Sequence, residues 1–150
     1  MADHLLSLTW GAEDLPAALG TVASRGADGA FTDPYRAARA LALFAAHAAR
    51  TEAIETVYPA IGDLAGLHAY AEQGQRDGFT GMLALHPAQV PIINAAFTPD
   101  SEQVRAARDV VAAFAAAPDA GVLMLGGRMI DAPHLAQARR LLARASATED

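Results

Sequence analysis

The sequence contains neither cysteine nor lysine among its 150 residues. Without cysteine, the chain cannot form disulfides, thiolate metal sites or a cysteine nucleophile. The 11 basic residues are therefore all arginine, and 17 acidic residues leave a net charge of −6. Scattered arginines on an acidic chain do not provide the positive surface that binds nucleic-acid phosphates, so the composition argues against a nucleic-acid partner.

Long apolar runs are also missing, although 53% of the residues are hydrophobic. Much of that share is alanine, and charged residues or proline interrupt every apolar run before the ~20 residues that a transmembrane helix requires. The first ten residues lack the basic start and long apolar stretch of a signal peptide. These features predict a cytoplasmic protein with no membrane partner.

The alternation of strand-like and helix-like segments predicts an α/β fold with a parallel sheet. Three short apolar runs, over 4–11, 52–59 and 81–87, have the composition of buried strands and end at glycine or proline. Helices are predicted between them, over 33–50 and 63–76, and a loop over 21–33. Strands separated by helices favour right-handed crossovers and parallel pairing.

The remaining third of the chain is predicted to be mainly helical. Helices are expected over 88–96 and 101–117, and a last one begins near Asp131. The apolar run 122–125 suits an edge strand or a hairpin, and the residues beyond Ser146 are expected to fray.

Helical spacing also predicts which faces pack. On the helix over 33–50 we expect one face to be buried and the other to be wet. The expected buried face holds Leu41, Phe44, Ala45 and Ala48, and the expected wet face holds Arg36, Arg39, His47 and Arg50. On the later helices the expected inward residues are Val104, Ala107, Val111 and Phe114, then Leu135, Ala138, Leu142 and Ala145.

Ligands of parallel α/β folds bind beyond the carboxyl ends of the strands, which directs attention to three segments. After the first strand, one of the adjacent carboxylates Glu13 and Asp14 could bind Mg²⁺, or the pair could simply favour the first turn of a helix. After the second, Glu55 and Asp63 could face one cavity, although Asp63 is more simply a helix N-cap. After the third, His86 could move protons, but a hydrogen-bonded structural histidine is the more common case.

A fourth cluster of candidate residues lies near the C-terminus. Gly126 and Gly127 permit the close approach of a ligand or another backbone, and Arg128 could pair with a phosphate or a carboxylate. Asp131 is well placed to cap the last helix, so spacing alone does not assign it an acid–base role. No phosphate-binding loop, dinucleotide fingerprint, zinc pattern or nucleophile elbow occurs in the sequence.

Taken in order, four segments resemble the citrate lyase beta-subunit-like family of CoA-ester lyases, within the 4-hydroxy-2-oxoheptanedioate aldolase superfamily. They are Trp10-Gly11-Ala12-Glu13-Asp14-Leu15 with Leu19-Gly20; Ala53-Ile54-Glu55-Thr56-Val57-Tyr58 with Asp63; Gly78-Phe79-Thr80-Gly81 with Leu85-His86-Pro87-Ala88-Gln89; and Gly127-Arg128-Met129-Ile130-Asp131-Ala132-Pro133-His134. Asn94, Phe97 and Pro99 match the asparagine, phenylalanine and proline of the family pattern. The match extends over nearly the whole chain.

The resemblance implies a (β/α)₈ TIM barrel with a C-terminal extension, usually assembled as trimers. The family cleaves or forms a carbon–carbon bond in 3-hydroxyacyl thioesters with Mg²⁺. By the resemblance, Asp14 is a metal ligand at the end of the sixth strand, and Asp131, on the lid of a neighbouring subunit, transfers a proton. Residues 1–120 would form the last three βα units of the barrel, and residues 121–150 a C-terminal helical lid or extension.

The chain departs from the family pattern chiefly in length. A barrel of this type takes about 250 residues, so the first five strands would be missing. The family's second metal-binding glutamate and the arginine that stabilises the enolate would be missing with them. Smaller departures are Met82 and Arg128 where lysine is common, and Glu55 where aspartate is frequent.

Two functions remain open on this basis. The first is a Mg²⁺-dependent lyase part that acts on citryl, malyl or citramalyl thioesters of CoA or an acyl carrier and yields a 2-oxo acid. Three strands cannot close a barrel, so we expect a homo-oligomer or a partner chain that supplies the N-terminal half-barrel. The alternative is a non-catalytic binding or assembly module. On either reading, the chain by itself could lack catalytic activity.

Overall fold

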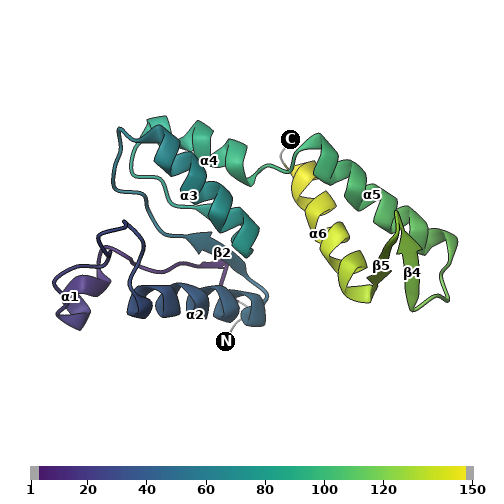
Figure 1. Ribbon diagram of the computed structural model, residues 1–150, viewed down its shortest axis with the longest axis horizontal. Helices are drawn as coiled ribbons and strands as arrows, with labels where there is room; N and C mark the ends of the chain where they lie inside the picture. The colour runs from purple at the N-terminus through teal and green to yellow at the C-terminus, as the bar shows by residue number, and fades with distance from the viewer. Residues whose placement is uncertain (1–3, 148–150) are drawn as a thin grey trace. The chain divides into compact units, whose positions relative to one another are not determined.

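The computed structural model describes residues 4–147, and these form two compact units, one ending at Phe97 and one beginning at Thr98 (Figure 1). The residues beyond 147, where fraying is expected, lie outside the described part. The first unit contains β1 (Ser7–Leu8), α1 (Leu15–Leu19), α2 (Asp33–Ala49), β2 (Glu52–Glu55), α3 (Leu64–Asp77), β3 (Gly81–Met82), the 3-10 turn η2 (Pro87–Gln89) and α4 (Val90–Phe97). The second contains α5 (Ser101–Ala116), β4 (Val122–Leu125), β5 (Arg128–Asp131) and α6 (Ala132–Ala147).

The sheet of the first unit is parallel, in the order β1-β2-β3, which confirms the predicted strand–helix alternation. Ser7 pairs with Glu52 and Ile54 pairs with Gly81. The strands are shorter than expected, and beyond the end of β2 side-chain hydrogen bonds take the place of the ladder. The Thr56 amide donates to the Glu55 carboxylate at 2.8 Å, and Gln89 donates its side-chain amide to the Tyr58 carbonyl at 2.9 Å.

An aromatic core fills the space between this sheet and α2. Trp10 meets Phe31 edge to face at 5.2 Å between ring centroids, and Phe31 stacks on Tyr35 at 6.1 Å. Phe31 comes from the predicted loop over 21–33, where it forms an isolated bridge with Arg25. The packing of the Phe31 ring therefore holds the loop against the core, although the loop contains no strand or helix of its own.

The buried face predicted for α2 is wrong, whereas the predicted wet face is confirmed at Arg36, His47 and Arg50, which are exposed. Leu41 and Phe44 are 67% and 66% exposed, and Ala45 and Ala48 are exposed as well. The helix instead buries Tyr35, Leu43 and Ala46. Arg39, expected to be wet, lies on the inner side with a side chain only 15% exposed, because it reaches the buried Glu55. Both of these faces of the helix are apolar enough to pack. The face that does pack is the one from which Arg39 forms its long-range ion pair with Glu55.

In the second unit, α5 and α6 lie side by side and pack with the antiparallel hairpin β4–β5. Gly126 and Gly127 form the turn with φ angles of 56° and 77°, a left-handed conformation that glycine adopts without strain. The expected inward faces of both helices are confirmed, since Ala107 and Ala138 are buried. The run 122–125 is thus the first strand of a hairpin.

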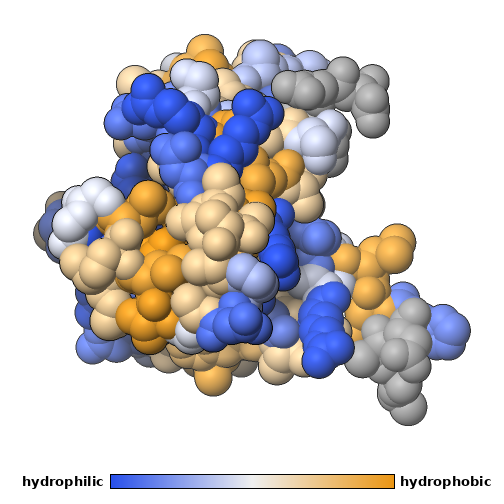
Figure 2. Space-filling model, turned by 90° about the vertical axis from the view of Figure 1, so that its right-hand side faces the viewer, coloured by the Kyte–Doolittle hydropathy of each residue, from blue (hydrophilic) through white to orange (hydrophobic). Residues whose placement is uncertain are grey.

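The hairpin leaves one of its faces apolar and exposed. Leu123 pairs with Ile130 on the side toward the helices, whereas Val122, Met124 and Met129 are 56%, 69% and 57% exposed. Figure 2 shows apolar side chains gathered between hydrophilic ones on the face that it views. Among residues 4–147, no helix is long and apolar enough to cross a membrane.

Candidate functional site

Asp14 lies just beyond the carboxyl end of β1, at the start of α1. The backbone N–H groups of Asp14 and Leu15 donate to the Gly11 carbonyl at 3.2 and 3.0 Å, which closes a tight turn. A Cβ atom on Gly11 would lie 2.8 Å from Oδ2 of Asp14, so the carboxylate lies directly over this glycine. Asp14 occupies the N-cap position of α1 but makes no side-chain cap hydrogen bond. Its exposed carboxylate is therefore not used by the helix.

Glu55 does not share a cavity with Asp63, contrary to one of the sequence-based alternatives. It is fully buried at the end of β2 and faces the helices. Its carboxylate accepts from the Trp10 indole N–H at 2.7 Å and from Nε of Arg39 at 2.6 Å. Arg39 also donates from Nη1 to Asp77 at 2.6 Å. The sequence offered one hint of this network, because a buried tryptophan N–H requires an acceptor.

The charges of this network shift the pKa values of its members. Burial opposes the charge of Arg39, but Glu55 and then Asp77 outweigh it, so the pKa of the guanidinium is above its usual value. Burial raises the pKa of the Tyr70 hydroxyl, and the nearby negative charge of Glu55 raises it further. Both shifts favour a fixed arrangement, a charged arginine beside a neutral tyrosine.

Asp63 is an N-cap, as the sequence favoured. Its Oδ1 accepts from the Gly66 amide at 2.9 Å, and its Oδ2 accepts from the Tyr58 hydroxyl at 2.8 Å. The backbone hydrogen bond, followed by that from Tyr58, lowers the pKa of Asp63. His86 likewise has a structural role, since its Nδ1 accepts from the Ala88 amide at 3.1 Å at the start of η2.

Asp131 ends β5 and pairs with His134 one turn later, at the beginning of α6. Oδ1 of Asp131 lies 2.5 Å from Nδ1 of His134, and the Asp131 backbone N–H lies 3.2 Å from the same nitrogen. A protonated Nδ1 donates to the carboxylate, and a deprotonated Nδ1 accepts from the backbone amide. Both side chains are partly exposed, at 34% for Asp131 and 45% for His134. The tautomer of His134 therefore decides which of the two contacts is a hydrogen bond.

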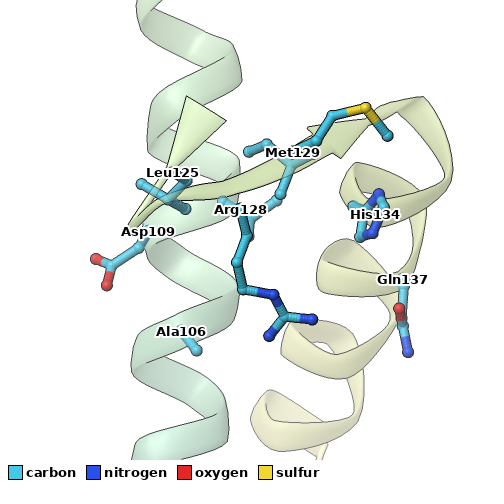
Figure 3. Close-up of a pocket in the computed structure, with 9 residues that line it drawn as sticks. Ala106, Asp109, Leu125, Arg128, Met129, His134 and Gln137 are labelled. Atoms are coloured by element: carbon cyan, nitrogen blue, oxygen red, sulfur yellow. The ribbon is translucent and has the colours of Figure 1, made fainter. Parts of the chain in front are cut away.

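An open pocket of about 370 Å³ lies between the hairpin and the two helices of the second unit. Arg128 extends from β5 into the space between α5 and α6, and Asp109 points away from it (Figure 3). His134 and Gln137 line the α6 side of the pocket. The pocket therefore borders the Asp131–His134 pair.

The described residues include one candidate metal ligand, Asp14, and no full set of ligands. Within residues 4–147, no three aspartate, glutamate or histidine side chains are grouped closely enough to hold a metal. Mg²⁺ accepts one or two protein carboxylates and completes its octahedron with water and substrate oxygens. The exposed carboxylate of Asp14, which caps nothing, fits one such position.

Comparison with known proteins shows which family this chain belongs to. Residues 1–87 match the family model described as HpcH/HpaI aldolase/citrate lyase. The chain belongs to this family. Among its relatives within the family, a citrate lyase subunit beta-like protein of Mycobacterium tuberculosis is 38% identical over 144 residues, which cover 96% of this chain and 52% of that protein.

A second relative and one solved structure extend the comparison. A (3S)-malyl-CoA thioesterase of Cereibacter sphaeroides is 38% identical over 109 residues, covering 71% of this chain and 38% of that enzyme. The structure of CitE from M. tuberculosis, in complex with magnesium, acetoacetate and coenzyme A, matches with a TM-score of 0.80 and 38% identity, over 92% of this chain and 51% of CitE. The chain spans about half the length of these two M. tuberculosis proteins.

Proposed function

We propose that this chain is the C-terminal part of a Mg²⁺-dependent carbon–carbon lyase. Its substrate would be a 3-hydroxyacyl thioester such as citryl-, malyl- or citramalyl-CoA, or the acyl-carrier equivalent, and its products an acyl thioester and a 2-oxo acid. The observation that carries the proposal is Asp14, an exposed carboxylate free of capping at the carboxyl end of a parallel strand. The similarity to CitE, whose structure holds magnesium and coenzyme A, supports the same metal and substrate class.

Each candidate residue has a distinct role in this proposal. Asp14 would hold the metal, which supplies a Lewis acid for the oxygens of the 2-oxo acid when bound. Asp131 would transfer the proton at the reacting carbon from a lid on a neighbouring subunit. The 2.5 Å contact with His134 supports that role, because the imidazole can return or remove the proton of the carboxylate.

We also propose that residues 1–120 supply the last three βα units of a TIM barrel and residues 121–150 its lid. The parallel order β1-β2-β3 with helices between the strands supports the barrel part. By packing, the chain divides earlier, after Phe97, so that α5 belongs with the hairpin and α6. The functional boundary at residue 120 stays a prediction.

The partner in this proposal is a second copy of the chain or a chain that supplies the N-terminal half-barrel. Its support is the surface of α2, where Leu41 and Phe44 are largely exposed beside exposed alanines. β1 and β3 are the edges of the described sheet, and each has one paired side. Unpaired strand edges and apolar stripes are surfaces that proteins normally cover.

The test is thioester cleavage measured with and without a chain that carries the first five strands of the barrel. We expect Mg²⁺-dependent release of the 2-oxo acid only when both chains are present. Asp14→Ala should lower that activity by ~10²-fold or more, because it removes a ligand of the metal. Persistent inactivity of the mixture, or activity indifferent to Asp14→Ala, would contradict the proposal.

The second candidate function is a non-catalytic binding or assembly module. It is favoured for the chain alone because the second metal-binding glutamate and the enolate-stabilising arginine implied by the family resemblance would lie on the first five barrel strands, which this chain does not supply. This module would bind the CoA thioester with equal affinity in the presence or absence of Mg²⁺, and adding the missing strands would produce no turnover. The same assay should record free CoA, because one relative is named a thioesterase and hydrolysis would release it.

A further inference from the structure

Glu55 is an unusual residue to find at the end of β2, because its carboxylate is fully buried. Burying a charge is unfavourable unless the charge is paired and hydrogen-bonded. Arg39 provides the opposite charge, and the Trp10 indole and the Thr56 amide provide two more hydrogen bonds. Both carboxylate oxygens are therefore occupied by the protein, and Glu55 has no free oxygen facing a substrate or a metal.

Two hydrogen bonds connect this buried carboxylate and its neighbour to the segment after β1. The Trp10 indole N–H donates to Glu55, and the Ala12 backbone N–H donates to Oγ1 of Thr56 at 3.3 Å. Trp10 and Ala12 are both buried, and they flank Gly11 on either side. The end of β2 thus holds the residue before Gly11 and the residue after it.

Gly11 in turn sets the position of Asp14. Its carbonyl accepts the Asp14 and Leu15 amides at 3.2 and 3.0 Å, and the Asp14 carboxylate lies over its Cα, where a Cβ would approach Oδ2 to 2.8 Å. The contacts run without a break from Glu55 and Thr56, through Trp10 and Ala12, to the turn that carries Asp14.

We propose that Glu55 and Thr56 are positioning residues that hold the Gly11 turn and thereby aim the carboxylate of Asp14. The metal-binding consequence rests on the proposed function, whereas the positioning of the turn does not. Glu55 acts through Trp10 and touches no reacting group. Residues that orient a metal ligand from behind commonly change metal affinity by roughly 10- to 100-fold when they are altered.

The experiment removes each of the two hydrogen bonds to the Gly11 segment by a substitution that keeps an apolar side chain in the core. Thr56→Val removes the acceptor for Ala12, Trp10→Phe removes the indole donor, and both leave the Glu55–Arg39 pair intact. Asp77→Asn is the matched control, because it alters the far side of Arg39 and neither connection to the turn. All three variants are made in the full chain, and circular dichroism checks that each is folded.

The first measurement is amide hydrogen exchange at Asp14 and Leu15, whose N–H groups close the Gly11 turn. We expect exchange at these two amides to be about tenfold faster in Thr56→Val and Trp10→Phe and unchanged in Asp77→Asn. Unchanged exchange in both of the first two variants would overturn the positioning role, whatever the metal does.

The second measurement is a calorimetric titration of each protein with Mg²⁺ as the only ligand. We expect Thr56→Val and Trp10→Phe to weaken binding about tenfold, and Asp14→Asn to abolish it. Unchanged Mg²⁺ affinity in the first two variants would overturn the link between the turn and the ligand. If the wild-type chain binds no Mg²⁺ even when the chain that carries the first five strands is added, while exchange still responds to the variants, the positioning role stands and the metal role of Asp14 is wrong.

Discussion

At the scale of single residues, four carboxylates of this chain differ in what surrounds them and so in what they can do. Asp14 is exposed and caps nothing, whereas Glu55 is buried and fully hydrogen-bonded. Asp63 accepts two hydrogen bonds at a helix start, and Asp131 contacts an imidazole. The environment of each carboxylate therefore separates a candidate metal ligand, a structural charge, a helix cap and a candidate proton carrier among four groups of the same chemical type.

Asp63 gives a pH-dependent prediction. Its hydrogen bonds to the Gly66 amide and then to Tyr58 lower its pKa, so the folded state binds the proton less readily than the unfolded chain does. The stability that this carboxylate contributes is present above its unfolded pKa and is lost as the pH falls through its lower folded pKa.

We therefore expect Asp63→Ala to lower the urea midpoint at pH 7, and the difference from wild type to shrink below about pH 4. Fluorescence of Trp10, the single tryptophan, reports the unfolding of the unit that contains α3. Asp119→Ala, at an exposed position outside the helices, serves as the control. A difference that stays constant between pH 7 and pH 3 would contradict the assigned cause.

At the scale of elements, helix α2 has apolar residues on two faces, and the sequence pattern predicts burial of the face that is in fact exposed. Leu43 is 9% exposed and Leu41 is 67% exposed, although both are leucines of one helix. The inner face is marked by Arg39, which lies among apolar residues because Glu55 and Asp77 accept its hydrogen bonds. A rule that places arginine outside is correct for Arg36 and Arg50 and fails at Arg39.

The two leucines form a matched pair for a stability measurement. We expect Leu43→Ala to destabilise the first unit by about 2–5 kcal/mol, because a buried leucine leaves a cavity. Leu41→Ala should change the free energy of unfolding by less than about 0.5 kcal/mol, since the side chain is already in water. Urea denaturation followed by Trp10 fluorescence measures both, and equal effects would contradict the assigned face.

At the scale of the whole molecule, the chain has two compact units and the length of about half a family member. Each unit leaves apolar side chains uncovered, on α2 in the first and on the hairpin in the second. Isolated exposed apolar residues are common, but Leu41 and Phe44 are neighbours at helical spacing. Such a stripe favours association with another polypeptide.

We expect the purified chain to associate, and the double variant Leu41→Gln with Phe44→Gln to weaken that association. Sedimentation velocity over a range of concentrations measures the change in mass. Val22→Gln is the control, because Val22 is fully exposed on a loop away from the stripe. A monomeric wild type, or a double variant with unchanged association, would contradict a role for α2 in contacts between copies.

Local patterns were sufficient for the elements and their order. The strand–helix alternation, the Asp63 cap and the inward faces of α5 and α6 were all predictable, because each depends on residues a few positions apart. Asp14 and Asp131 were found through family segments, and their roles stay predictions. The buried face of α2, with Arg39, and the burial of Glu55 were not predictable, since they depend on partners far along the chain.

The sequence by itself thus determined the family, the parallel α/β order and the acidic residues to examine. Only the tertiary structure decided that Arg39 turns inward and that Glu55 lies beneath the turn carrying Asp14. The physical reason is the cost of a buried charge. Glu55 is favourable in the interior only where Arg39, Trp10 and Thr56 meet it, and the first two lie 16 and 45 residues away in the chain.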